Sequence, residues 1–146
     1  MLDRLAYFAY ARNYPGHTWA TLREPATLIN LQPHLHLRGK DVDVKITYPS
    51  GETVDVLKVP HYSYLWQLIY ILQQPLRLPK GARIDLFVHW DNSPNNPFKT
   101  DYSKSVRWGD QSWDEMLGLY FGLIVDREVD VHHMVAMRQF PNANQD

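Results

Sequence analysis

The sequence predicts an all-β fold, an antiparallel β-sandwich of jelly-roll-like type with little helix. Short segments in which apolar and polar residues alternate recur along the chain, and turn-forming residues separate them. Nine Tyr and five Trp also suit a strand-rich protein. With 146 residues, 45% of them hydrophobic, the chain is large and apolar enough to form one domain around a buried core.

The first expected element is an N-terminal extension over residues 1–25 that packs on the domain. Residues 1–12 fit a short amphipathic helix or an edge element, and the Tyr-Pro-Gly step at 14–16 ends it. Residues 26–37 then have the composition of a strand. We expect this strand to be interrupted or bent near Pro33, because proline cannot donate a hydrogen bond to a sheet.

A hairpin and a further strand are expected next. Residues 42–48 alternate Val, Ile and Tyr with Asp, Lys and Thr, which predicts a half-buried strand. A Pro-Ser-Gly turn follows at 49–51, and residues 52–59 return as the second arm of the hairpin. Residues 62–72 are rich in aromatic and aliphatic side chains and predict another strand, although 65–72 also fit a helix.

The last part of the chain is predicted to hold two strands and a long loop. A turn at residues 78–81 precedes a strand at 82–90. Residues 91–111 are rich in Asn, Pro and Ser, and irregular loops of that length are often functional. Residues 116–125 predict a final core strand, and residues 126–146 a polar tail.

Composition excludes several classes of function. The chain has no cysteine, so disulfides, thiolate metal sites and cysteine nucleophiles are excluded. A net charge of -1 gives no electrostatic support for nucleic acid or an anionic membrane as a partner. No segment approaches the run of about 20 apolar residues that would span a bilayer. Phosphate-binding loops, G-x-S-x-G elbows and H-E-x-x-H motifs are also absent from the sequence.

Two histidines one residue apart, His34 and His36, are the first candidates for metal ligands. Side chains two positions apart on a strand project from the same face, so both imidazoles can approach one ion. Met116, far along the chain, adds a thioether if the fold returns it to this strand. Nitrogen and sulfur donors without a thiolate favour copper, and Cu(I) in particular accepts methionine. The trio therefore predicts a copper site.

Each candidate also has a simpler interpretation. An H-x-H pair occurs by chance as two surface imidazoles, and a methionine that precedes leucine is most often a core residue. The spacing from His34 and His36 to Asp41 is similar to the histidine-rich motif of cupins, which has glutamate in the acidic position. His89 leads directly into the loop at 91–111, and a lone histidine there is most simply a hydrogen-bonded structural residue.

Three sequence blocks carry a resemblance that covers about residues 26–125. They are PHLHLRGK at 33–40, HWDNSPNNP at 89–97 and VRWGDQSWDEM at 106–116. Together they resemble the C-terminal copper domain of the type II, ascorbate-dependent copper monooxygenases, the family of peptidylglycine α-hydroxylating monooxygenase and dopamine β-hydroxylase. A closer match is to bacterial single-domain relatives, which carry P-H-M-H-L-R-G-K, then H-F-D-N-S-P-N-N-P, then V-R-W-G-[DE]-Q-[ST]-W-[DE]-E-M.

The resemblance implies a copper monooxygenase-like sandwich over residues 26–125, with one copper ion held by His34, His36 and Met116. In the family this copper activates dioxygen and oxidises an aliphatic C–H bond of a small molecule. The implied partners are that substrate, an external electron donor and a redox partner domain. The implied location is periplasmic or secreted, although residues 1–12 lack the pattern of a signal peptide.

The chain departs from the family in three ways. The family's second copper domain, which supplies electrons, has no counterpart in this sequence. The disulfides of the animal enzymes cannot form without cysteine. His89 lies where the animal enzymes use no ligand, and it is either an additional copper ligand or a residue that orients one.

Two functions remain open from the sequence. The first is a mononuclear copper oxidoreductase that uses dioxygen or peroxide and an external reductant. The alternative is a non-catalytic copper-binding or electron-transfer module of a larger exported assembly, which the missing second copper domain favours. A metal-free sandwich that binds partners through the loop at 91–111 is a third interpretation.

Overall fold

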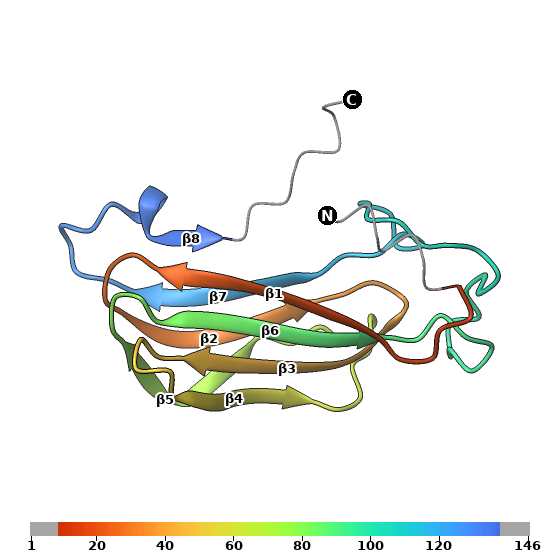
Figure 1. Ribbon diagram of the computed structural model, residues 1–146, viewed down its shortest axis with the longest axis horizontal. Helices are drawn as coiled ribbons and strands as arrows, with labels where there is room; N and C mark the ends of the chain where they lie inside the picture. The colour runs from red at the N-terminus through yellow and green to blue at the C-terminus, as the bar shows by residue number, and fades with distance from the viewer. Residues whose placement is uncertain (1–8, 138–146) are drawn as a thin grey trace.

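Eight strands and one 3₁₀ turn form the regular structure of residues 9–137, the part of the chain described by the computed structural model (Figure 1). The elements are β1 (Tyr14–Leu22), β2 (Ala26–His34), β3 (Gly39–Thr47), β4 (Thr53–Val59), β5 (Tyr70–Leu78), β6 (Arg83–Trp90), β7 (Gly118–Ile124), η2 (Val131–His133) and β8 (Val135–Met137). Within these residues, no helix has the length and apolar character needed to cross a bilayer.

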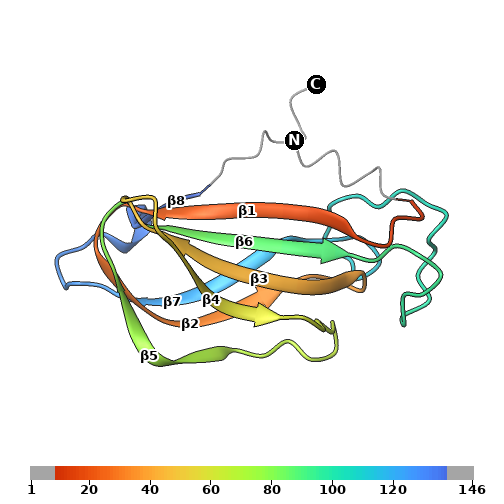
Figure 2. The same cartoon turned by 60° about the horizontal axis from the view of Figure 1, so that its bottom comes forward.

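The strands form two antiparallel sheets that pack face to face, which confirms the predicted all-β sandwich. The larger sheet has the order β4-β3-β6-β1-β8 and the smaller one the order β5-β2-β7. The two views show the sheets as separate layers, with the ends of several strands meeting the long loop on one side (Figure 1, Figure 2). Leu, Val and Ile side chains from both sheets fill the space between them.

Alternation decides which side chains enter the core. On β3, Val42, Val44 and Ile46 are buried, and the residues between them are partly exposed. On β6, Ile84, Leu86, Val88 and Trp90 face the core. The hairpin from β3 to β4 pairs Thr47 with Thr53 across the expected turn. The period-two pattern therefore predicted these strands and their inner faces correctly.

The two ends of the described chain belong to the sandwich more fully than the sequence indicated. We expected residues 1–25 to form an extension, but β1 lies inside the larger sheet, between β6 and β8. We expected a polar tail after residue 125, but β8 pairs with the end of β1, with Ala20 opposite Met137. The helix or edge element predicted over residues 1–12 falls mostly on residues 1–8, which lie outside the described part.

The strand predicted at residues 62–72 is wrong for most of its length. β5 begins only at Tyr70, and the residues before it form turns and irregular chain. Leu65 and Trp66 are exposed, so their apolar character does not reflect burial. Side-chain hydrogen bonds from this segment reach the end of β2 instead of a strand ladder. Those bonds build one side of the candidate site.

The long loop after β6 remains irregular, as predicted, and its asparagines hold it in place. Asn92 and Asn96 are both buried. The Asn96 side-chain amide donates to the carbonyl oxygens of Asp91 and Leu37 at 2.7 and 3.1 Å. Asn92 Nδ2 donates to the Lys104 carbonyl at 3.1 Å. These side chains replace a sheet as the source of backbone hydrogen bonds, in agreement with the preference of Asn for turns.

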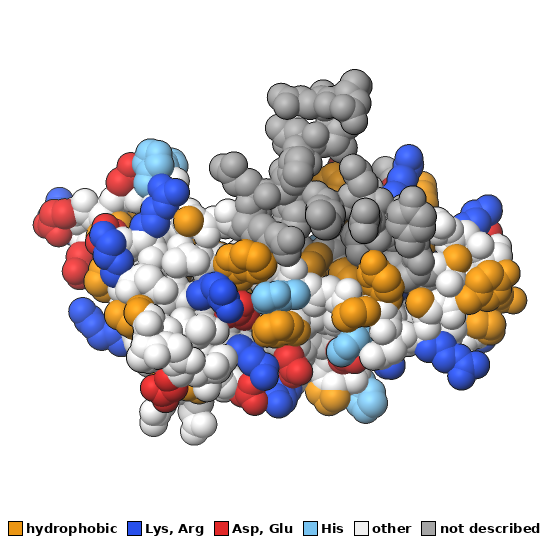
Figure 3. All heavy atoms as spheres, viewed as in Figure 1, with side chains coloured by type: hydrophobic (Ala, Val, Ile, Leu, Met, Phe, Trp, Pro, Cys, Tyr) orange, Lys and Arg blue, Asp and Glu red, His pale blue; other side chains and the backbone are white. Residues whose placement is uncertain are grey.

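The outer face of the larger sheet is charged, and its centre is a buried carboxylate. Histidine, acidic and basic side chains are mixed over this face (Figure 3). Asp85 is 1% exposed, and it accepts hydrogen bonds from Thr47 at 2.8 Å, Arg83 at 2.9 Å and His17 at 2.9 Å. Burial acts to raise the pKa of Asp85, but the hydrogen bonds from Arg83, His17 and Thr47 outweigh it and lower the pKa. The carboxylate thus joins β1, β3 and β6.

Candidate functional site

His34 and His36 lie where β2 ends and the chain turns toward β3. His34 is the last residue of β2 and pairs with Gly118 on β7. A Cβ at Gly118 would lie 3.5 Å from His34 Cβ, so the two positions are in ordinary van der Waals range. His36 follows in the irregular connection and is buried. The centroids of the two rings are 5.1 Å apart and the rings are nearly perpendicular, so the two imidazoles are neighbours.

Gln67 fixes the orientation of the His34 ring. Its Nε2 donates to the Tyr64 carbonyl at 2.9 Å, so its Oε1 must be the atom that faces His34 Nδ1 at 2.6 Å. Because Oε1 is an acceptor only, His34 Nδ1 carries the proton. The tautomer that follows leaves Nε2 with its lone pair. A histidine that ligates a metal through one nitrogen typically donates the other to such a partner.

His36 has an unusual environment for a buried imidazole. Its Nδ1 is enclosed and has no hydrogen-bond partner within the described part of the chain. Burial lowers the pKa of His36, and the nearby His34 lowers it further, while the backbone of Asp114 and of Gln111 acts in the opposite direction. The ring is therefore neutral at pH 7, which is the form that binds metals.

Glu115 holds the backbone that carries His36. Its Oε2 accepts hydrogen bonds from His36 N at 3.0 Å and from Trp90 Nε1 at 2.9 Å, and its Oε1 accepts one from Arg38 N at 2.8 Å. The Met116 N–H adds a fourth at 3.2 Å. Glu115 is 0% exposed. Burial raises the pKa of its carboxyl to about 7, although the backbone N–H groups that bond to it act to lower that pKa. One side chain thus links both sheets at the site.

Tyr62 holds the residue between the two histidines. Its hydroxyl accepts from Leu35 N at 2.9 Å and donates to the Leu35 carbonyl at 2.6 Å. Burial raises the pKa of Tyr62 to about 12, so the phenol stays protonated and keeps both bonds. The segment is therefore fixed at three consecutive positions, by Gln67, Tyr62 and Glu115, before any ligand is present.

Met116 lies two residues before the start of β7. β2 and β7 are antiparallel, and their register sets His34 opposite Gly118. The paired register ends there, and Met116 and His36 both lie just beyond it in irregular chain. The Met116 side chain is half-buried, and its backbone N–H is bound to Glu115. The topology therefore returns this methionine to the end of β2.

His89 lies on the opposite side of the molecule from His34. Its neighbours on β6, Val88 and Trp90, face the core, so His89 faces outward from the larger sheet. Its Nδ1 is 2.7 Å from Asp41 Oδ1. Within residues 9–137, no three His, Asp or Glu side chains form a group able to hold a metal ion. The structure thus does not bring His89, or the cupin-like Asp41, to His34 and His36.

The aromatic residues near the site are surface groups. Trp108, Trp113 and Tyr120 are 49%, 64% and 65% exposed. The Tyr120 ring centroid lies 6.4 Å from that of His34, and the Tyr64 centroid lies 6.0 Å from that of His36. Tyrosines therefore flank the histidine pair on two sides.

The smaller sheet is nearly free of charge. Residues 25–37, 59–76 and 116–125 contain no Lys, Arg, Asp or Glu, and together they include β2, β7 and most of β5. Ile71 on β5 is 81% exposed, and it shares the outer face with Tyr120. His34 therefore lies on an uncharged surface on which exposed Ile71 and Tyr120 are mixed with Asn30 and Gln32, in contrast to the charged face of the larger sheet.

Comparison with known proteins adds no assignment to this geometry. No protein-family model matches the chain, and no curated protein matches its sequence. The functional argument therefore depends on the site itself.

Sequence reasoning missed the three side chains that hold the site, Glu115, Tyr62 and Gln67. The only signal was the acidic pair Asp114-Glu115 at the start of an apolar strand, which is an unexpected place for a carboxylate. Nothing in the sequence indicates that residues 62–67 reach the end of β2.

Proposed function

We propose that the protein is a mononuclear copper oxidoreductase in which His34, His36 and Met116 hold one copper ion. The observation that carries the proposal is a pair of neighbouring imidazoles that are held rigidly yet keep ring nitrogens unused by the protein. His34 is oriented by Gln67, and His36 has a buried nitrogen without a partner. Rigid placement of ligand side chains by surrounding hydrogen bonds is typical of built metal sites.

The donor set favours copper over other metals. Two neutral imidazoles and a thioether, with no carboxylate or thiolate, suit Cu(I) and still support Cu(II). Zinc sites more commonly complete such a pair with a third histidine, a carboxylate or cysteine. The described residues offer no such third group near His34 and His36. The carboxylate bonded to the backbone of this segment, Glu115, is already occupied by four N–H donors.

Bound copper would supply the one-electron chemistry that activates dioxygen or peroxide toward a C–H bond. Hydroxylation by dioxygen places one oxygen atom in the product and the other in water, and it consumes two electrons and two protons. Those electrons come from an external reductant such as ascorbate. With peroxide as oxidant, the same product and one water form without added electrons. The chain's own part is to hold the ligands, keep the His36 imidazole neutral and present the substrate.

The surroundings of His34 support an apolar substrate. The face that carries His34 lacks charged side chains near the site and exposes Tyr120 and Ile71. An anionic or cationic substrate would find no opposite charge on these strands, whereas an alkyl or aromatic group would remove apolar surface from water. We therefore propose oxidation of an uncharged, apolar C–H substrate.

Copper binding tests the ligand set directly. We expect one Cu(I) per chain and X-ray absorption with nitrogen and sulfur scatterers. Met116→Leu should remove the sulfur signal and weaken Cu(I) binding. Met137→Leu is the matched control, because Met137 is an exposed methionine on β8. Retention of the sulfur signal in Met116→Leu would reject this methionine as a ligand.

Activity is tested with the copper-loaded chain. We expect ascorbate-dependent oxygen uptake, or peroxide consumption, with hydroxylation of an uncharged alkylbenzene at a rate above that of free copper. His36→Ala should abolish it, and His61→Ala, a change at an exposed histidine, should not. Turnover no faster than free copper would reject the enzyme and leave copper binding intact.

The second candidate is a copper-binding module that exchanges electrons with a partner domain. The observation that favours it is the exposed apolar surface beside His34, which a partner domain would cover. Tight copper binding without oxygen uptake, together with electron transfer to an added redox protein, would support this alternative.

A further inference from the structure

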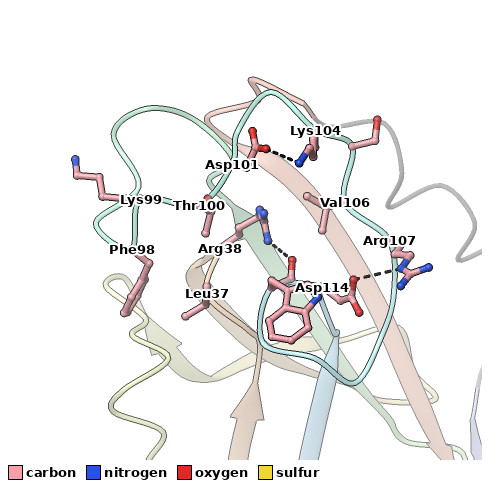
Figure 4. Close-up of a pocket in the computed structure, with 12 residues that line it drawn as sticks. Leu37, Arg38, Phe98, Lys99, Thr100, Asp101, Lys104, Val106, Arg107 and Asp114 are labelled. Atoms are coloured by element: carbon pink, nitrogen blue, oxygen red, sulfur yellow. Dashed lines mark hydrogen bonds and ion pairs between the residues drawn. The ribbon is translucent and has the colours of Figure 1, made fainter.

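A cavity of about 640 Å³ lies between the end of β2 and the long loop after β6 (Figure 4). Leu37 and Arg38 form one side of it, and residues 98–107 form most of the other. None of the three proposed copper ligands lines it. The cavity is therefore distinct from the proposed copper site. Neither the sequence motifs nor the proposed function assigns it a role.

Arg38 brings a buried positive charge to this cavity. The residue is 4% exposed. Its Nε donates to Asn92 Oδ1 and its Nη1 to the Trp113 carbonyl, each at 2.8 Å, and both acceptors are neutral. Within residues 9–137 no carboxylate forms an ion pair with the guanidinium and no hydrogen bond reaches its Nη2, although the charges of Glu115, Asp101 and Asp114 favour its protonated form. A buried guanidinium is normally paired with a carboxylate or another anion.

Thr100 adds an unused hydroxyl. Its Oγ1 is buried and has no hydrogen-bond partner within the described chain. Thr100 lines the same cavity as Arg38, while Figure 4 shows Lys99 pointing away from it. The other charges at the rim are already paired, since Lys104 contacts Asp101 at 2.9 Å and Asp114 contacts an arginine of the loop at 3.3 Å. Arg38 and Thr100 are thus two buried polar groups of the cavity lining with unused hydrogen-bonding capacity.

Part of the cavity lining is apolar. Leu37, Phe98, Val106 and Trp113 line the cavity, and Val106 is buried in the core. A small, fully hydrated anion such as phosphate would lose hydration against these walls. A carboxylate on an apolar body would use both parts of the cavity, because a guanidinium matches the planar carboxylate and the body covers apolar surface.

We propose that this cavity binds an organic carboxylate, with Arg38 and Thr100 contacting the carboxylate and the apolar walls contacting its hydrocarbon part. The site is independent of the proposed copper centre, so the test uses the metal-free chain.

The test is a titration of the full chain with phenylacetate at pH 7, followed by amide chemical shifts of the 98–107 loop and by calorimetry. We expect saturable binding at this loop, roughly tenfold to a hundredfold tighter than for the uncharged isostere phenylacetamide, because charge-assisted hydrogen bonds are the strong ones. Arg38→Gln should abolish the preference for the anion.

Arg38→Gln also removes bonds to Asn92 and Trp113, so Thr100→Val is the second variant. Its lost hydroxyl has no partner among residues 9–137, so folding should be unaffected, and phenylacetate affinity should fall roughly threefold to tenfold. Thr53→Val, a change on the exposed strand β4, is the matched control. Absence of saturable binding, equal affinity for phenylacetamide, or unchanged affinity in Thr100→Val would each overturn the proposal.

Discussion

At the scale of single residues, Glu115 organises the candidate site more than the predicted ligands do. Its carboxylate accepts backbone N–H groups from the connection after β2 and from the start of β7, and the indole N–H of Trp90 on β6. It therefore joins three chain segments at the point where a metal would bind. A carboxylate with this many donors acts as a structural centre and has no free oxygen for a metal.

Replacing Glu115 with glutamine tests that role. The amide keeps the shape but offers one oxygen for four donors and adds N–H groups of its own. Each buried donor left unpaired costs about 1–3 kcal/mol. We expect Glu115→Gln to lower the free energy of urea unfolding by at least that amount. Glu128→Gln, at an exposed position, should have almost no effect. A Glu115→Gln variant as stable as the wild type would contradict this account.

Gln67 gives a prediction about affinity rather than stability. Gln67→Leu removes the acceptor that holds the Nδ1 proton of His34. Loss of such an orienting partner typically lowers metal affinity about 10–100-fold. We expect that decrease in Cu(I) affinity by competition with a chelator, with little change in stability. Gln74→Leu, on the exposed part of β5, is the control. Equal affinities in the two variants would remove Gln67 from the site.

At the scale of elements, β1 supports the site through contact with β6. Gly16 on β1 lies against Trp90 on β6, and a Cβ at Gly16 would come within 2.5 Å of Trp90 Cη2. Trp90 is 1% exposed and its indole N–H is bonded to Glu115. The Trp90 ring therefore cannot move without disturbing the carboxylate that holds the histidine segment.

Alanine substitutions at two glycines separate this contact from a general strand effect. Gly16→Ala should destabilise the protein by about 1–3 kcal/mol, because the core around Trp90 is overpacked. Gly118→Ala should be much milder, since its Cβ would make an ordinary 3.5 Å contact with His34. Thermal unfolding of both variants checks the difference. If both variants lost the same amount of stability, the Trp90 ring would have to be able to shift and make room for the added methyl group.

The sequence allowed the regular strands to be predicted but not the parts that build the site. Val42, Val44 and Ile46 alternate clearly because one side of β3 faces the core and the other is exposed. β1 was not predicted, because the Pro-Gly step near its start is typical of a turn. In addition, its outward-facing side chains cover the buried Asp85, so they do not follow the usual alternation of apolar and exposed polar residues. Glu115 was missed because its partners lie 25, 77 and 79 residues away. Contacts of that range leave no local pattern.

At the scale of the whole molecule, the two outer faces differ in chemistry. The larger sheet presents charged side chains around the carboxylate of Asp85, whereas the smaller sheet presents uncharged side chains around His34. Because Asp85 connects β1, β3 and β6, its ionisation affects unfolding of the entire domain.

The dependence of stability on acidic pH should reveal the contribution of the Asp85 carboxylate. The pKa of Asp85 is lowered in the folded state, so its stabilising contribution is present above its ordinary value of 3.8 and is lost as the pH falls through the folded value. We expect the urea midpoint of the wild type to fall more between about pH 5 and about pH 2.5 than that of Asp85→Asn. Asp126→Asn, an exposed change, should follow the wild type. Parallel pH profiles for wild type and Asp85→Asn would contradict this.

The position of β1 also has a consequence for biosynthesis. It is the first strand of the described chain to leave the ribosome, but its neighbours in the sheet are β6 and β8. The hydrogen bond between His17 and Asp85 cannot form until a further 68 residues have been synthesised. At about 5–20 residues per second, a nascent β1 stays unpaired for roughly 3–14 s. Closure of so long a loop makes folding slow, and it leaves the unpaired edges of the early hairpin exposed to chaperones in that interval.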